Sequence, residues 1–273
     1  MTPDDDAVAA SRRPVDLAAV RDASTARGRW SIRAVAETGS TNDDLAAAAR
    51  SGAADGTVLI SELQRAGKGR LGRTWTAPTG SGLTMSVLLS LPTVPVPRRG
   101  WIGALTGLSL AAAVRRVAGV DTSLKWPNDL LVDGAKCAGL LAEATADGVV
   151  VGFGLNVTLR REELPRPDAT SLLLAGASRW DRAVIAAAVL DDLALRLDRW
   201  TAAAGDPDRS GLRDDYRKVC ATLGVPVRVE LPGGGAVTGV ARDVTVDGSL
   251  EVDTPTGRRA FAAADVRHLR PGD

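Results

Sequence analysis

Four short apolar segments lie close together between residues 123 and 156, and they constrain the fold more than any other part of the chain. They read SLKW, DLLV, KCAGLLAEA and VVVGFGL. Asp133-Gly134 and Asp147-Gly148 separate the last three segments, and Asp-Gly is a residue pair that tight hairpin turns favour. The spacing therefore predicts successive strands joined by hairpins.

Further strands and helices are expected on both sides of this cluster. The hydrophobic patterns predict strands at 31–37, 57–63 and 82–91, and helices at 16–24, 41–49, 100–117, 181–200 and 208–219. The helix at 100–117 is apolar nearly all round, so we expect it to be buried. Residues 1–15 have no periodicity and are predicted to form a loose tail.

The pattern changes at Val225, where short strand-like segments alternate with Gly-rich turns. This pattern predicts a small β-barrel of about 50 residues. We therefore expect an α+β protein in three parts: an N-terminal tail with a short helix at 1–29, a large domain at 30–221, and a small β domain at 222–273.

Composition excludes several classes of protein. The net charge of +1 gives no global reason to bind DNA or a membrane. The N-terminus is acidic and unlike a signal peptide, and no apolar run approaches the roughly 18 residues of a membrane span. Two cysteines and one histidine do not make a disulfide framework or a Cys/His zinc site. We expect a cytoplasmic protein.

Residue usage points to particular segments. Of the 34 basic residues only four are lysines, and the chain holds three asparagines and one glutamine. Against a background rich in Arg, Ala and Gly, these rare residues are candidates for function. They include Lys68, Lys125, Lys136, Asn42, Asn128, Asn156 and Gln64.

Residues 64–82 are predicted to form a long loop, and such loops are often functional. The segment 67–72 matches G-x-G-x-x-G, but no helix follows it, so a dinucleotide-binding motif is excluded. Lys68, Arg70 and Arg73 lie among glycines, which suits an anion that is bound and then enclosed. The alternative is a solvated basic loop.

KWPNDLLV at 125–132 places Lys125 beside a tryptophan, with Asn128 and Asp129 at a strand end or turn. Lys136 follows a hairpin turn and is expected to point back towards Lys125. Two cations at one strand end suit a carboxylate or phosphate. The alternatives are a surface turn for Pro-Asn-Asp and an edge charge for Lys136.

Two more segments carry polar groups. Asn156 ends the strand GFGLN, where it can read an adenine edge with one donor and one acceptor; a plain turn asparagine is the alternative. TGSTN at 38–42 starts a helix, and simple N-capping by Ser40 or Thr41 is the alternative there. The single histidine, His268, is assigned no role.

Taken together, five segments resemble the biotin–protein ligase family. They are TGSTN at 38–42, ELQRAGKGRLGR at 62–73, KWPNDL at 125–130, KCAGLLAE at 136–143 and GFGLN at 152–156. The resemblance covers about residues 30–270. It implies a catalytic domain with the class II aminoacyl-tRNA synthetase-like fold, which has a mixed sheet and flanking helices, and a C-terminal SH3-like domain.

The resemblance also implies roles for individual residues. Ser40, Thr41, Asn42 and Gln64 would hold biotin, whose ureido ring needs paired donors and acceptors. Lys68, Gly69 and Arg70 would close over biotin and the adenylate. Lys136 and Lys125 would act at the carboxylate and α-phosphate, with Asp129 orienting a cation or metal. Asn128 and Asn156 would recognise adenine, and Arg73 and Arg270 would bind the nucleotide.

The implied reaction activates biotin with ATP and Mg²⁺ as biotinyl-5′-AMP and transfers biotin to a lysine of a biotin carboxyl carrier protein domain. Cations and Mg²⁺ neutralise the carboxylate and phosphate, so no covalent enzyme intermediate is required. This agrees with the lack of a Ser–His or Cys–His arrangement.

Two positions depart from the family pattern. Lys68 stands where the loop usually has arginine, which keeps the charge but loses bidentate geometry. Cys137 replaces the usual leucine after Lys136, and we expect it to be a core residue.

Three other functions are weighed against this one. A lipoate–protein ligase shares the fold, but its triple-glycine segment followed by His-Asp does not appear. A DNA-binding repressor of this family carries a helix-turn-helix, for which the roughly 30 residues before the first strand are too few. An inactive binding module would have little reason to retain Lys125, Lys136 and the basic loop together.

Overall fold

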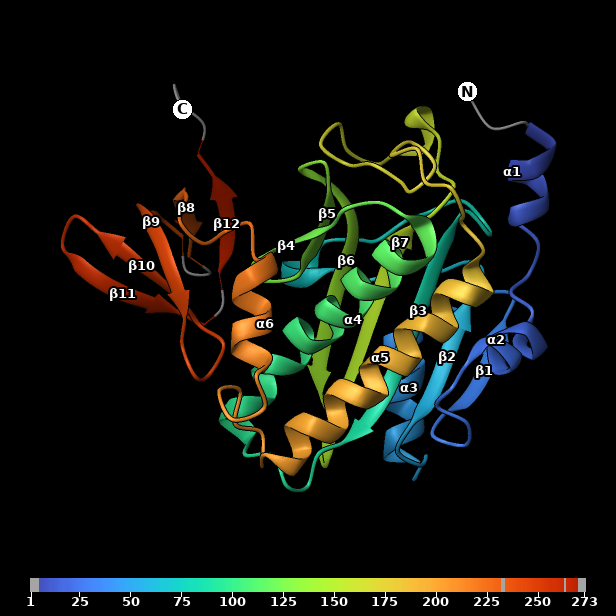
Figure 1. Ribbon diagram of the computed structural model, residues 1–273, viewed down its shortest axis with the longest axis horizontal. Coiled ribbons are helices and arrows are strands. Elements are labelled where there is room, and N and C mark those ends of the chain that lie inside the picture. Colours follow the sequence, from blue (N-terminus) through green and yellow to red (C-terminus); the bar gives the residue numbers. More distant parts are fainter. Residues whose placement is uncertain (1–4, 232–233, 263, 270–273) are drawn as a thin grey trace.

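The computed structural model describes residues 5–231, 234–262 and 264–269. Its larger sheet has seven strands in the order β1-β2-β3-β7-β6-β5-β4 (Figure 1). The strands are β1 (Ser31–Val35), β2 (Thr57–Ser61), β3 (Gly82–Ser90), β4 (Ser123–Lys125), β5 (Asp129–Val132), β6 (Ala135–Ala144) and β7 (Gly148–Asn156). Only β1 and β2 pair in parallel. The sheet is therefore mixed, as expected.

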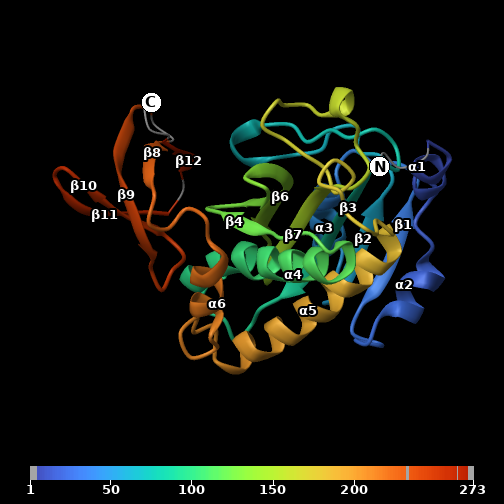
Figure 2. The ribbon, with the colours of Figure 1, turned by 45° about the horizontal axis from the view of Figure 1, so that its top comes forward.

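Helices cover both faces of this sheet. Helices α4 (Trp101–Ala118) and α5 (Arg182–Ala202) lie side by side on one face, and α3 (Thr41–Arg50) lies on the other (Figure 2). Strand β2 is buried on both faces: Val58 and Ile60 belong to the large core, whereas Leu59 joins a small cluster with Leu45 of α3. The predicted buried helix at 100–117 is confirmed. None of the described helices is both long and apolar enough to cross a membrane.

The predicted hairpins are present, but only one has the expected turn. Between β5 and β6, Asp133 and Gly134 both have positive φ, at 50° and 75°, as a type I′ turn requires. Between β6 and β7 the turn spans 145–148, closed by a hydrogen bond from Thr145 N to Gly148 O. Gly148 has ordinary backbone angles; a Cβ there would lie 1.9 Å from Leu89 O, so glycine is needed for close packing.

The C-terminal part forms a second sheet. Five antiparallel strands lie in the order β11-β10-β9-β8-β12 (Figure 1). They are β8 (Pro226–Glu230), β9 (Ala236–Val244), β10 (Leu250–Thr254), β11 (Gly257–Phe261) and β12 (Asp265–His268). The predicted run of short strands after Val225 is therefore confirmed.

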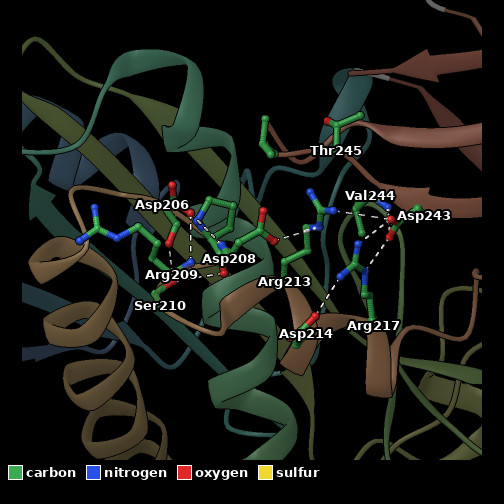
Figure 3. A network of polar contacts seen from close by, with 12 residues as sticks. Asp206, Asp208, Arg209, Ser210, Arg213, Asp214, Arg217, Asp243, Val244 and Thr245 are labelled. Carbon is green, nitrogen blue, oxygen red and sulfur yellow. Dashed lines mark hydrogen bonds and ion pairs between the residues drawn. The ribbon is translucent and has the colours of Figure 1, made fainter.

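Helix α6 (Leu212–Val219) contacts β4 of the large sheet, and a network of charges joins it to β9 of the second sheet (Figure 3). Arg217 donates to both oxygens of Asp243 in β9, at 2.8 and 2.6 Å, and to Asp214 at 2.8 Å. The Arg217 hydrogen bond lowers the pKa of Asp243. This helix was predicted from residue 208, but it begins after Gly211, whose φ of 75° is left-handed.

The prediction of a loose N-terminal tail is wrong for residues 5–15. Helix α1 (Asp5–Ser11) precedes a segment that packs against the main body, and α2 (Leu17–Ala23) packs against α5. Val8 and Val15 are buried. Hydrogen bonds to residues far along the chain also anchor Arg12, Arg13 and Val15.

Candidate active site

A cavity of about 1170 Å³ lies at one end of the large sheet, between the long loop and the C-terminal domain. Thirteen of the predicted site residues line it: Ser40, Thr41, Asn42, Gln64, Lys68, Gly69, Arg70, Arg73, Lys125, Asn128, Asp129, Lys136 and Asn156. The fourteenth, Arg270, lies outside the described residues. The structure therefore brings all the described candidates to one place.

A buried polar network forms one wall of the cavity. Gln64 Oε1 accepts from Thr41 N at 2.8 Å and from Thr41 Oγ1 at 3.0 Å. Ser86 Oγ lies 2.6 Å from Thr41 Oγ1 and donates to Asn42 Oδ1 at 2.7 Å. Asn42 Nδ2 donates to Glu143 at 2.7 Å. Ser40 is the N-cap residue of α3, but its side chain makes no capping bond. These groups thus fix one another's orientation inside the cavity.

Glycines on β7 keep this wall open. A Cβ at Gly152 would lie 2.2 Å from Asn42 Oδ1 and 2.5 Å from Ser86 Oγ. At Gly154 a Cβ would lie 2.2 Å from the Trp75 ring. The glycines of GFGLN therefore make room for polar side chains and for the aromatic ring that lines the cavity.

If the polar wall holds biotin, as the resemblance implies, Gly152→Ala should weaken biotin binding while the protein stays folded. The new methyl group displaces Asn42 and Ser86, and a lost hydrogen bond in a buried polar site costs about 1–3 kcal/mol, which is roughly 5- to 150-fold in KM for biotin. Steady-state kinetics at saturating ATP measures this. Gly103→Ala is the control, since a Cβ there meets nothing within 4 Å. An unchanged KM in Gly152→Ala would show that the network does not touch biotin.

Cationic side chains occupy the next part of the cavity. Lys136 Nζ lies 2.5 Å from Asp129 Oδ1, and both side chains are about one-fifth exposed, at 21% and 19%. Burial lowers the pKa of Lys125, and the nearby charge of Lys136 acts in the same direction. Both lysines line the cavity, and the charge of Lys136 reaches Lys125; that the two act together stays a prediction.

The loop cations have protein partners. Lys68 pairs with Asp43 at 2.5 Å, Arg73 pairs with Asp265, and Arg70 Nη1 donates to Ala264 O at 3.4 Å. Burial lowers the pKa of Arg70. The sequence predicted that these cations bind and enclose an anion, with a solvated basic loop as the alternative. Residues of α3 and of the C-terminal domain already compensate two of them.

The two asparagines that were predicted to recognise adenine both donate hydrogen bonds to main-chain carbonyl groups. Asn128 Nδ2 donates to Leu140 O, and Asn156 Nδ2 donates to Thr170 O, both at 2.9 Å. Asn156 Oδ1 is buried and has no hydrogen-bond partner. An unpaired buried acceptor is costly, and a ligand N–H group would relieve that cost.

Several residues that line the cavity were missed or dismissed from the sequence, among them Ser86 of the polar wall. Trp75 covers Gly154, while Arg166 and Asp168 pair with each other near the lysines. His268 Nε2 lies 3.0 Å from Thr222 Oγ1. Burial, followed by the charge of Lys125, lowers the pKa of His268. Trp75 could have been predicted, because it is an aromatic residue in the glycine-rich loop. The other residues stand in no local sequence pattern that indicates a site.

Cys137 is a core residue, as expected. It is fully buried, and burial raises the pKa of its thiol to about 12.

The donor set fits magnesium held mainly by a nucleotide. The described residues contain no cluster of three or more His, Cys, Asp or Glu side chains that could hold a metal ion. Mg²⁺ usually keeps several waters and is bound by one or two carboxylates together with substrate phosphates. Asp129 and Asp168, whose charges both act on Lys125, line the cavity and would be the carboxylates to take part.

Comparisons with known proteins agree with this architecture. Residues 37–157 match the Biotin/lipoate A/B protein ligase family, and residues 222–269 match the Biotin protein ligase C-terminal domain. The chain is 44% identical to the biotin–(acetyl-CoA-carboxylase) ligase of Mycobacterium tuberculosis, over 95% of this chain and 97% of that protein. The chain therefore belongs to the biotin protein ligase family, and the fold expected from the resemblance is confirmed.

A further relative and a solved structure are similar to most of this chain. The bifunctional ligase/repressor BirA of Escherichia coli is 30% identical over 71% of this chain and 61% of its own length. The biotin protein ligase from Aquifex aeolicus in complex with biotin and ATP superposes with a TM-score of 0.74 at 26% identity. That match covers 87% of this chain and 99% of that one.

Proposed function

We propose that the protein activates biotin with ATP and transfers it to a specific lysine of a biotin carboxyl carrier domain of a carboxylase. The observation that carries the proposal is the single cavity that joins a polar wall to a cluster of cations. The name of the Mycobacterium tuberculosis relative supports a carboxylase as the acceptor. The proposed boundary between 30–221 and 222–273 is supported by two sheets that share no strand pairing among the described residues, whereas α2 of the segment 1–29 packs against α5 of the large domain.

In the first step a biotin carboxylate oxygen attacks the α-phosphorus of ATP, and pyrophosphate leaves. Both reactants are anions, so the positive charges of Lys125 and Lys136 bring them together and stabilise the charge that develops. Bound Mg²⁺ neutralises phosphate charge. Asp129 keeps Lys136 pointing into the cavity through their 2.5 Å contact.

In the second step the acceptor lysine's amine attacks the carbonyl carbon of the adenylate. An amide bond forms, the bond to the phosphate oxygen breaks, and AMP leaves. The polar wall would hold the ureido ring, and the unpaired Asn156 Oδ1 would accept from the adenine amino group. Arg73 and Arg270 are proposed to bind the nucleotide phosphates, which requires Arg73 to exchange Asp265 for a phosphate.

Incubation of the protein with biotin, ATP, Mg²⁺ and a carrier domain tests this function. The expected products are carrier with one added biotin, AMP and pyrophosphate in equal amounts. Mass spectrometry of the carrier and chromatography of the nucleotides measure them. Omission of ATP is the control. A carrier of unchanged mass with ATP present would refute the proposal.

We expect Arg70→Gly to form the adenylate but retain it poorly. Arg70 contacts the C-terminal domain at Ala264 from a loop that holds four glycines between 64 and 80, so its loss removes one contact of the closed state and adds flexibility. Chromatography of free biotinyl-5′-AMP in the medium measures the escape. Proteolysis near Arg70 in the wild type, with and without biotin and ATP, reports loop closure. Unchanged proteolysis with ligands, or no extra adenylate release by the variant, would contradict this role.

A further inference from the structure

Both ends of the active-site loop meet at one point of the large sheet. Glu62 follows β2 and precedes the biotin-site residue Gln64, while Gly80 precedes β3. Gly80 N donates to Glu62 O at 3.1 Å. Glu62 and Gly80 therefore form the base of the loop. A residue that fixes their positions also fixes where the closing loop begins and ends.

Residues 12–15, here called the N-terminal strap, touch both ends of the loop. Val15 N donates to Glu62 Oε1 at 2.7 Å. Gly80 has a φ of +69°, and a Cβ there would lie 2.2 Å from Arg12 O. Glycine is therefore required at the loop's end for two reasons: its left-handed backbone and the close passage of the strap.

A buried arginine binds the strap and the loop base together. Arg182, at the start of α5, is 4% exposed. Its Nη1 donates to Glu62 Oε2 at 2.6 Å and to Gly82 O at 3.1 Å, and its Nη2 donates to Arg13 O at 2.5 Å. A buried pair of this kind tolerates little displacement, because losing one partner leaves an uncompensated charge.

The side chain of Arg12 fixes the strap to the segment that follows β7. It makes a two-pronged pair with Glu163, at 2.9 and 2.6 Å, and its Nη2 donates to Thr158 O at 2.7 Å. The Arg12 hydrogen bond lowers the pKa of Glu163. Bidentate arginine–carboxylate pairs are geometrically specific, so this contact defines the strap's course.

We propose that the N-terminal strap is a positioning element of the biotin site, with Arg12 as its anchor. By fixing Glu62 and Gly80 it limits the positions of Gln64 and of the loop that closes over the ligand. Ordering of the strap and ordering of the loop are then coupled, so that loss of the anchor weakens retention of the ligand. The inference rests on the proposed biotin-ligase function.

Arg12→Ala tests the proposal in the full-length chain. We expect KM for biotin to rise and the half-life of the bound adenylate to fall, each by about five- to tenfold, with kcat at saturating biotin within about twofold. Cleavage of the ligand-free loop near Arg70 should be faster. Arg12→Ala combined with Glu163→Ala should add little to either single change, because the two residues form one contact.

Arg29→Ala is the matched control. It breaks another ion pair of the N-terminal region, Arg29 with Asp55 at 2.9 Å, which lies outside the loop base. Its kinetics and loop cleavage should equal the wild type's. If Arg12→Ala unfolds below the assay temperature, Glu163→Gln, which keeps the shape of the pair, provides the same measurements with a smaller change.

The outcomes separate the two proposals. If the wild type fails to biotinylate the carrier, the proposed function is wrong. If the wild type is active and the folded Arg12 or Glu163 variant keeps its biotin KM, adenylate half-life and loop cleavage within twofold, the strap is only structural and the inference is overturned.

Discussion

With ATP and a carrier domain, the protein should biotinylate the acceptor lysine and leave lipoate almost untouched. Sites built around buried hydrogen bonds reject analogues that lack them by up to roughly 10⁴-fold in kcat/KM. The wall of Thr41, Asn42 and Ser86 is buried and offers hydroxyl and amide groups. A ureido ring presents N–H and C=O groups to that wall. A dithiolane ring presents neither, so it would cover polar groups without replacing their lost contacts with water.

Parallel incubations with biotin and with lipoate, read as carrier mass over time, measure this ratio. The comparison is informative because the matching family description includes both biotin and lipoate ligases. A competition experiment with both acids at equal concentration uses one preparation of the carrier domain, so differences between carrier preparations do not affect the ratio. Equal mass gain from the two acids would contradict a site specific for the ureido ring.

Most of the site could be predicted from the sequence, because several of the sequence motifs lie on strands that pair with one another. Gly82 pairs with Asn156, and Asp129 pairs with Gly139. Short segments far apart in the chain therefore converge once the strand order is formed. Hairpin signals and the buried helix at 100–117 depend on local preferences, and both were predicted successfully apart from the turn at 145–148.

The contacts that could not be predicted from local sequence patterns join distant parts of the chain. Arg73 meets Asp265 across 192 positions, and Arg12 meets Glu163 across 151. Their existence depends on how the C-terminal sheet and the N-terminal strap dock onto the large sheet. No periodicity or turn chemistry encodes that docking. For the same reason His268, near the chain end, gave no sign that it lines the cavity.

Lys136→Ala should reduce adenylate formation at least about a hundredfold, which corresponds to roughly 3 kcal/mol of lost transition-state stabilisation. Lys136 is the lysine whose ammonium group is held by Asp129 in the cavity. Its removal deletes a positive charge where two anions must meet. It also leaves the Asp129 carboxylate without its cation, which adds repulsion towards the incoming phosphate. Folding should survive, because Lys136 is partly exposed at the start of β6 and its backbone bonds to Asp168 and Thr170 are retained.

Biotin-dependent exchange of pyrophosphate into ATP, together with thermal unfolding, measures the effect. Lys218→Ala is the matched control, since that lysine also pairs with an aspartate, Asp215 at 3.3 Å, but lies on the exposed surface of α6. The control should keep full exchange activity. Lys136→Arg helps to separate the effect of charge from that of shape, because it keeps the positive charge. Partial recovery of exchange activity indicates an electrostatic role. No recovery indicates that the compact ammonium group is required. Exchange by Lys136→Ala within a few-fold of wild type would make Lys136 an edge charge of the sheet and remove it from the reaction.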